Sequence, residues 1–232
     1  AGPTRLVSGP APTTSPITAP IPGGNFEITG APFAVNEDIT ASTGRISAGT
    51  LQGSGSFRFN QSLLWNSGTV GGSGILLMPV GSHLQVRDGS QGLQRVLNIN
   101  GTSLFRNMSM NLINSTINNT GTLTFDGDST NQFFGGFFNP TPVNAFNNSG
   151  TIIKLGSGTS QIITSSSTVP FNNTGLVRVE RGIFNVTVSN ISSGAFLSSG
   201  QYRIFNGATF NHGTNITTLT ADVELSGTGA LS

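Results

Sequence analysis

Apolar and polar residues alternate over short segments of this chain, and turns rich in Asn, Gly, Ser and Thr separate the segments. Alternation with a period of two predicts β-strands in which every second side chain is buried. Phe26–Thr29, Met108–Leu112 and Thr122–Phe125 are examples, and no helical period extends over a useful length. The pattern therefore predicts an all-β protein.

One turn phrase recurs, and a strand pattern follows it each time. An apolar residue, two Asn, Ser or Thr, and Gly occur in this order at 146–150 and 171–175, with a weaker copy at 117–121. The final Gly residues lie 29 and 25 residues apart. Such an irregular period is typical of stacked repeats that bury their apolar faces against one another. Because Asn tolerates and Gly readily adopts left-handed conformations, each phrase is expected to form a corner, with stacked Asn side chains in hydrogen-bonded ladders.

A second repeat supports stacking. Residues 49–59 and 68–78 align at a spacing of 19 residues. Each segment reads GT-[apolar]-x-GSG-x-[apolar], where x is any residue. The two repeats predict a single right-handed parallel β-solenoid (β-helix) over residues 25–232, with a β-sandwich as the alternative. Gly121, Gly150 and Gly175 should then stack at one edge of the coil.

The same fold predicts which side chains face inward. Arg178 and Glu180 are expected to be exposed. The inward positions that alternate with them are expected among Phe171, Leu176, Val177, Val179, Ile183 and Phe184. Further core positions are expected at Phe57, Phe59, Leu76, Phe205 and Phe210.

Residues 1–24 have a different composition and hold six of the eleven Pro residues. Such a segment favours extended, polyproline-like backbone, so we expect an extended N-terminal arm, with a disordered linker as the alternative. Fully extended, the arm could reach a neighbouring molecule. We expect it to contact another copy of the chain rather than its own domain, through Val7, Ile17 and Ile21.

Composition limits the function. Charged residues make up only 8 % of the chain, and the net charge is +1. A nucleic-acid binder is therefore not expected, and neither membrane insertion nor surface attachment has a matching segment. The chain has no Cys, so disulfides do not indicate its compartment. Ala1 in place of an initiator Met suggests a processed, secreted chain or a trimmed one.

Several phrases occur in the order found in repeats of large secreted, mainly bacterial, surface proteins. They are the Trp-containing rung at 65–74, ValGlySerHisLeu at 80–84, the Asn-Asn corners at 117–128, 146–151 and 170–175, and AsnGlyAlaThrPhe at 206–210. Over about residues 49–232 the chain resembles these adhesin-like β-solenoid repeats. The resemblance implies the solenoid fold and an extracellular, secreted or cell-surface location, and no catalytic motif accompanies it.

Few residues have the spacing of a chemical site. Asp126 and Asp128 could form a carboxylate pair or a Ca²⁺ loop, or a solvated turn. His83 and His212 lack the spacing of metal ligands, and we expect them at the surface or in turns. Trp65 could be a platform for carbohydrate or part of the core. We expect no catalytic residue, cofactor or metal.

Sequons for N-glycosylation are the enriched surface signal, although the Asn-Asn corners account for part of the excess. Their acceptors are Asn60, Asn100, Asn107, Asn114, Asn118, Asn147, Asn172, Asn185, Asn190 and Asn215. They are glycan sites if the source glycosylates extracellular proteins, and turn residues otherwise.

The last residues, 223–232, repeat the pattern of the GSG rung and stop partway, which suggests an open last rung that could accept the next molecule. Val223, Leu225 and Leu231 are then candidate contacts between subunits. The expected function is a non-enzymatic extracellular structural protein, a subunit of a homopolymeric filament or matrix built by end-to-end stacking. The alternative is an adhesin or carbohydrate-binding module that uses a projecting Phe-rich loop at 133–138. Ice binding and enzyme activity are less favoured, because regular Thr rows and clustered carboxylates are missing.

Overall fold

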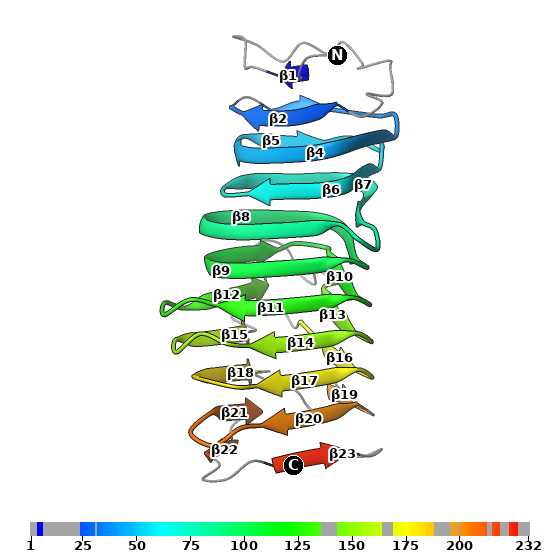
Figure 1. Ribbon diagram of the computed structural model, residues 1–232. Coiled ribbons are helices and arrows are strands. Elements are labelled where there is room, and N and C mark those ends of the chain that lie inside the picture. Colours follow the sequence, from blue (N-terminus) through cyan, green and yellow to red (C-terminus); the bar gives the residue numbers. More distant parts are fainter. Residues whose placement is uncertain are drawn as a thin grey trace.

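The described part of the chain is a right-handed coil of strands. The computed structural model describes residues 4–6, 24–30, 32–135, 143–163, 169–187, 196–198, 200–212, 215–218 and 223–226. These residues contain no helix, and parallel strands pair from one turn of the coil to the next (Figure 1). The predicted right-handed parallel β-solenoid is confirmed, and the β-sandwich is wrong.

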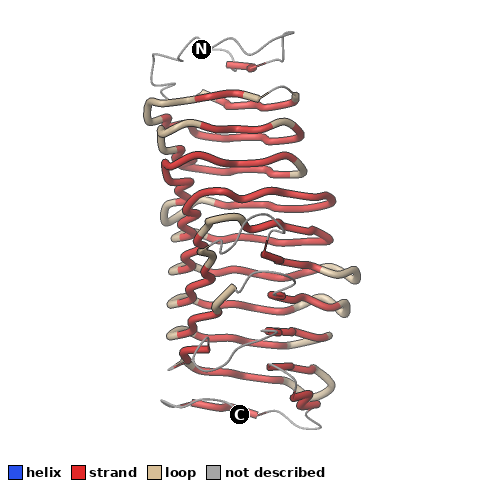
Figure 2. Tube along the Cα trace, turned by 180° about the vertical axis from the view of Figure 1, so that it is seen from behind, coloured by secondary structure: helices blue, strands red, loops and turns tan. Residues whose placement is uncertain are grey.

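Each turn of the coil contributes strands to three sheets, and within each sheet the strands of successive turns stack along the axis (Figure 2). Sheet 1 comprises β1 (Thr4–Leu6), β2 (Asn25–Thr29), the ends of β4 (Ile39–Ala48) and β6 (Phe57–Trp65), the starts of β8 (His83–Ile99) and β9 (Thr102–Leu112), β11 (Thr122–Asp126), β14 (Thr151–Lys154), β17 (Leu176–Val179) and β20 (Gln201–Ile204). Sheet 2 comprises β3 (Phe33–Ala34), β5 (Thr50–Gln52), the start of β7 (Gly68–Met78), the middle of β8, the end of β9, β12 (Asn131–Gly135), β15 (Thr159–Ile163), β18 (Ile183–Thr187) and β21 (Thr209–His212). Sheet 3 comprises the starts of β4 and β6, the ends of β7 and β8, β10 (Thr116–Asn119), β13 (Ala145–Asn148), β16 (Phe171–Asn173) and β19 (Phe196–Ser198).

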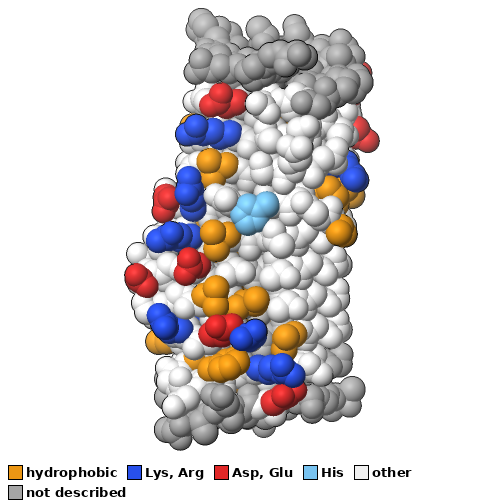
Figure 3. Space-filling model, in the orientation of Figure 1, with side chains coloured by type: hydrophobic (Ala, Val, Ile, Leu, Met, Phe, Trp, Pro, Cys, Tyr) orange, Lys and Arg blue, Asp and Glu red, His pale blue; other side chains and the backbone are white. Residues whose placement is uncertain are grey.

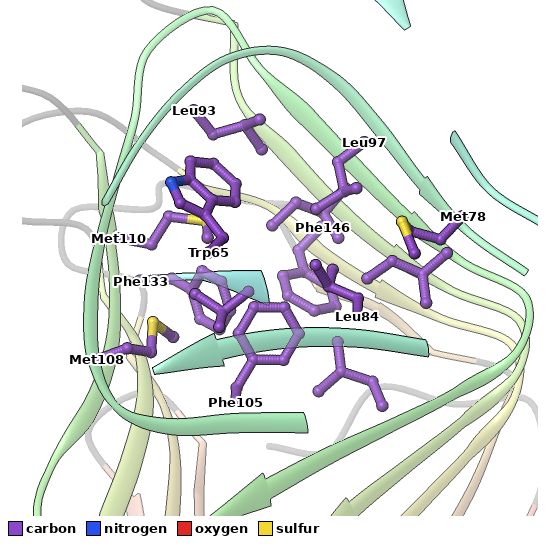
Figure 4. Packing of buried hydrophobic residues seen from close by; sticks show 14 of the residues in the cluster. Trp65, Met78, Leu84, Leu93, Leu97, Phe105, Met108, Met110, Phe133 and Phe146 are labelled. Atoms are coloured by element: carbon purple, nitrogen blue, oxygen red, sulfur yellow. The ribbon is translucent and has the colours of Figure 1, made fainter. Parts of the chain in front are cut away.

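Inward side chains of the three sheets form one continuous apolar core (Figure 4). Because pairing is in register, like residues stack: the ring centroids of Phe105 and Phe125 are 5.9 Å apart. Rings from different sheets also meet inside the coil, as Phe133 of sheet 2 and Phe146 of sheet 3 do, with centroids 5.4 Å apart. Such tilted and edge-to-face contacts add to the free energy gained by burying apolar area. The core therefore runs along the whole coil rather than forming a separate cluster in each turn.

The predicted register is correct. Phe171, Val177, Val179 and Phe184 are buried, whereas Arg178 and Glu180 lie outside with 41 % and 31 % of their side chains exposed. Leu176 and Ile183 take outward positions and are half-buried. Phe57, Phe59, Leu76 and Phe210 are core residues as expected. Phe205 is not: it follows β20, is half-buried on the outside, and has the Arg178 guanidinium 5.1 Å from its ring centroid.

The Asn-Asn corners join sheet 3 to sheet 1 and form two ladders, which confirms that expectation. In the inner, buried ladder, Asn119 Nδ2 donates to Asn148 Oδ1 and Asn148 Nδ2 donates to Asn173 Oδ1, both at 2.7 Å. The outer ladder is half-buried and runs through Asn98, Asn118, Asn147 and Asn172, with amide-to-amide bonds of 2.8–2.9 Å.

The corner glycines stack as predicted, but for a different reason. None of Gly121, Gly150 and Gly175 has a positive φ, so the expected left-handed conformation is wrong. Instead, the backbones approach closely. A Cβ on Gly150 would lie 2.2 Å from the Gly121 carbonyl oxygen, and one on Gly175 would lie 2.0 Å from that of Gly150. Glycine is required here because a side chain would collide with the turn below or above.

The chain itself covers parts of both ends of the coil. Thr4–Leu6 pair in parallel with Phe26–Ile28, so for these three residues the prediction that the arm contacts another copy rather than its own domain is wrong. At the other end, β22 (Asn215–Thr218) and β23 (Val223–Ser226) reverse direction and pair antiparallel with β21 and β20. The interpretation of 223–232 as an open parallel rung is therefore wrong for the strand that the structure describes.

Candidate functional sites

Lys154 is the first of two cations that are buried in the described part of the coil. It ends β14 at an inward position, in register with Phe125 and Val179, and its side chain is fully buried. Its ammonium group donates to the carbonyl oxygen of Gly156. Desolvation lowers the pKa of Lys154 to about 8, and the nearby carboxylates of Asp126 and Asp128 oppose this shift. Because sequence patterns place charged residues on the outside of a strand, the buried position of Lys154 could not be predicted from them.

Asp126 and Asp128 lie in different surroundings at the end of β11. Asp126 ends β11 on the outside of the coil, whereas Asp128 lies beyond Gly127, whose φ is 104°, in an exposed turn. The Ser157 hydroxyl donates to Asp128 Oδ1 at 2.6 Å, and this bond holds the pKa of the Asp128 carboxyl below its usual value. A general acid needs a raised pKa, so Asp128 does not fit that role. The solvated-turn interpretation fits better.

Arg95 is the second buried cation, and it lies against the first GSG corner. It points inward where sheet 2 turns into sheet 3, and it is only 3 % exposed. Its guanidinium donates to the carbonyl oxygens of Gly71 (from Nε at 2.7 Å), Gly55 (3.0 Å) and Gly53 (3.2 Å) and lies 4.9 Å from the Phe57 ring centroid. Burial lowers the Arg95 pKa to about 10, so the group remains charged at neutral pH. The first GSG corner and Gly71 thus turn carbonyl groups inward, and Arg95 satisfies them from one turn (Gly71) and two turns (Gly53 and Gly55) further along the coil.

The two histidines do not meet. His83 lies half-buried on the outside of sheet 1, where Nδ1 is 2.9 Å from Thr102 Oγ1. His212 ends β21, and its side chain is outside the described part. Across the described ranges, no group of three or more His, Cys, Asp or Glu side chains could hold a metal ion. That part of the chain likewise has no helix long and apolar enough to cross a membrane.

Two aromatic candidates for carbohydrate binding are core residues. Trp65 is fully buried, and its indole nitrogen lies 3.3 Å from the Gly68 carbonyl oxygen. Phe133 is also fully buried and belongs to β12, so the interpretation of 133–138 as a projecting loop is wrong at this residue. Phe134 is half-buried on the outside, and Phe137 and Phe138 lie outside the described residues. The alternation of β12 was concealed by four Phe residues around two Gly residues.

The structure sorts the ten sequons by position. Asn60 and Asn114 are exposed, whereas Asn100, Asn107 and Asn185 are half-buried. Asn118, Asn147 and Asn172 use their amide nitrogens, the atoms that would carry a glycan, in the outer ladder. Asn190 lies outside the described residues, and Asn215 begins β22, with its side chain outside them. Asn60 and Asn114 are therefore best placed to carry a glycan, and the ladder residues serve the corners.

The candidate contacts between subunits lie mostly beyond the described part. Val223 and Leu225 belong to β23, which covers the edge of β20, and their side chains are not described. Val7, Ile17, Ile21 and Leu231 lie outside the described residues.

Comparison with protein-family models, with curated proteins and with solved structures finds no match to this chain. We therefore infer the function from the coil and its surfaces.

Proposed function

We propose that this chain is a non-enzymatic structural protein of an extracellular filament or surface matrix, and that its copies associate end to end. The observation that carries the proposal is the regularity of the coil. From β2 to β20, inward and outward columns continue in register through sheet 1. Nine strands at a spacing of about 4.8 Å make a column about 40 Å tall. Such an object is suited to act as a rigid length of rod.

The surface composition supports the extracellular part of the proposal. Only 8 % of the residues are charged, and the outer columns are rich in Ser, Thr and Asn. The exposed sequons at Asn60 and Asn114 could carry glycans in a secreted protein. Cell-surface or matrix glycans would then be a second class of partner.

The strand edges at the two ends of the coil determine which backbone contacts between copies are possible. The edge of β2 already accepts one further parallel strand, β1, which shows that this end can be extended by strand addition. At the other end, β22 and β23 leave their outer edges for a partner, and β19 pairs only with β16 among the described strands. Contact between copies would join these edges, with the Pro-rich arm of residues 1–24 as a tethered second contact that raises the effective concentration of the first.

Electron microscopy of the full chain and of a variant without residues 1–20 tests the proposal. The full chain should form filaments, and the variant should keep its β-sheet circular dichroism but form shorter polymers or none. Substitution of Val7, Ile17 and Ile21 by Ser keeps the length of the arm and should weaken assembly in the same way. Single-chain particles from the full chain, or unchanged filaments from the deletion variant, would contradict the proposal.

Glycan binding through 133–138 remains less well supported than the structural role. Phe133→Ala would open a cavity in the core rather than remove a surface contact, so loss of binding by that variant would carry no information.

A further inference from the structure

The chain contains two Asn-Gly sequences, Asn100-Gly101 and Asn206-Gly207. Asparagine is thermolabile, because its side-chain amide can react with the backbone nitrogen of the residue that follows it. Glycine in the following position favours this reaction, since it has no Cβ to block the approach of the two groups. The structure places the two sequences in different surroundings and so distinguishes them.

Asn100-Gly101 lies in a packed corner between sheet 3 and sheet 1. The Gly101 N–H donates to the Met78 carbonyl oxygen at 3.3 Å. The Thr120 hydroxyl donates to Asn100 Oδ1 at 2.9 Å. Gly101 is also buried, and a Cβ there would lie 2.3 Å from the Ser82 carbonyl oxygen. The attacking nitrogen and the amide are both held in place, so this corner must open locally before they can react.

Asn206-Gly207 lies in an exposed turn between β20 and β21. The Ala208 N–H donates to the Phe205 carbonyl oxygen at 3.0 Å and closes the turn. Both central residues are exposed, and nothing lies within 4 Å of a Cβ added to Gly207. The Gly207 N–H donates no hydrogen bond to any residue that the structure describes. No backbone hydrogen bond therefore has to break to free this nitrogen.

We propose that Asn206 is a site of spontaneous modification, at which the folded chain converts this residue to aspartate and isoaspartate. The Gly207 nitrogen attacks Asn206 Cγ and forms an N–Cγ bond. The side-chain nitrogen leaves as ammonia and takes the proton of the Gly207 N–H with it. Water then opens the five-membered imide at one of its two carbonyl groups. Opening at Cγ gives aspartate, and opening at the backbone carbonyl gives isoaspartate, whose main chain contains one more carbon.

The products differ from asparagine in charge. Uncharged side chains and backbone cover most of the face in Figure 3, and only 8 % of all residues are charged. One new carboxylate at neutral pH offsets the formal net charge of +1. The isoelectric point should therefore fall as the chain ages, and a net charge near zero favours association of protein molecules.

The turn also connects the two strands that hold the closing strands of the coil. β20 pairs with β23, and β21 pairs with β22. Isoaspartate would lengthen the main chain at this connection. The inference goes beyond the proposed function, because the reaction needs only the folded chain and water and can occur in a protein that never forms filaments.

Peptide mapping of the full chain after incubation at mildly alkaline pH tests the proposal, with mass spectrometry to distinguish a carboxylate from an amide. In the folded chain, Asn206 should react at least about tenfold faster than Asn100, because the corner at Asn100 must open first. In urea that unfolds the chain, the two sites should react at similar rates, since Gly follows both. Comparison of the two conditions separates the effect of the fold from that of the local sequence.

Isoelectric focusing of two variants provides the control. Asn206→Ser removes the reacting amide and should abolish the acidic shift. Asn60→Ser removes an exposed asparagine that Gln follows and should leave the shift unchanged, with circular dichroism confirming the fold of both variants. Equal rates at Asn206 and Asn100 in the folded chain overturn the proposal. So does a folded chain in which Asn206 stays intact while both sites react in urea, or an acidic shift that persists in Asn206→Ser.

Discussion

Lys154 occupies an inward position that Phe125 and Val179 hold in the adjacent turns, and Arg95 occupies a similar place at another corner. Both cations donate to carbonyl oxygens of glycines that turn inward at corners. Buried carbonyl groups need donors, and a long cationic side chain can supply several. At the residue scale, the charges inside the coil are thus a consequence of corner geometry.

Lys154 should make stability depend on pH. Its pKa is about 8 in the folded chain against an ordinary value of 10.5, so the unfolded chain binds more protons between these values. The free energy of unfolding should therefore rise as pH increases from about 8 to about 10.5, by on the order of 1–3 kcal/mol. Urea titrations at pH 7 and pH 10 measure the rise. Lys154→Met should remove it, whereas Arg58→Met, which changes an exposed cation, should retain it.

Gly150→Ala should be strongly destabilising. Its Cβ would meet the Gly121 carbonyl oxygen at 2.2 Å, and backbone atoms on adjacent turns cannot move apart without breaking the ladder. We expect a loss of about 3 kcal/mol in the free energy of unfolding. Gly207→Ala is the comparison: φ there is 78°, but nothing lies within 4 Å of the added Cβ. It should cost only about 1 kcal/mol for the strained backbone, and equal losses in urea titrations would contradict the steric explanation.

At the scale of elements, the Asn-Asn corner behaves as a unit that repeats from turn to turn. In the inner ladder, only Asn148 in the middle both accepts a hydrogen bond from one Asn and donates one to the next. The two ends are left short of a partner, at Asn119 Oδ1 and Asn173 Nδ2. Longer ladders reduce the share of such end groups, so the corners stabilise the coil more as turns are added.

Asn148→Ala should destabilise the chain more than Asn147→Ala. The first change removes the shorter of two hydrogen bonds from both Asn119 Nδ2 and Asn173 Oδ1 in a buried place, and leaves only the bonds with the Thr151 carbonyl oxygen and the Gly175 N–H, at a cost of about 1–3 kcal/mol. The second removes a half-buried amide, and water can replace its bonds, so the loss should be about 1 kcal/mol or less. Thermal or urea unfolding of the two variants compares them directly, and a larger loss at Asn147 would refute the distinction between inner and outer ladders.

Sequence patterns predicted these corners and the strand register well, because both depend on neighbours along the chain. Phe171, Val177 and Val179 could be assigned from alternation alone. Arg95 and Lys154 could not, since their inward positions depend on carbonyl groups of other turns. The direction of β22 and β23 was also missed: alternation is the same in parallel and antiparallel strands, and only pairing distinguishes them.

At the scale of the whole molecule, the two antiparallel strands change what the end of the coil offers. β22 and β23 occupy the edges of β21 and β20, which would otherwise present unpaired backbone groups to other molecules. A coil without them would have open parallel edges on sheets 1 and 2. The same strands therefore limit uncontrolled growth and define the surface for any regulated contact.

Deletion of residues 213–232 should convert the chain into an aggregating species. The stacked turns above β20 and β21 keep their own pairing, so circular dichroism should still show β-sheet, while light scattering should increase with time and concentration. Deletion of residues 1–3, which precede β1, is a control that leaves the pairing of Thr4–Leu6 with β2 intact. A truncated chain that scatters no more light than this control at the same concentration would show that β22 and β23 do not protect the edges.

The direction of the backbone hydrogen bonds has a mechanical consequence. In every sheet they run from one turn to the next, along the axis of the coil. A pulling force on the two ends therefore loads one row of bonds at a time and peels turns off singly, instead of shearing many bonds together. Each turn of 18 to 29 residues would release a length of about 60–100 Å when extended. Under tension the protein would lengthen in steps, and so absorb work that would break a rigid bar.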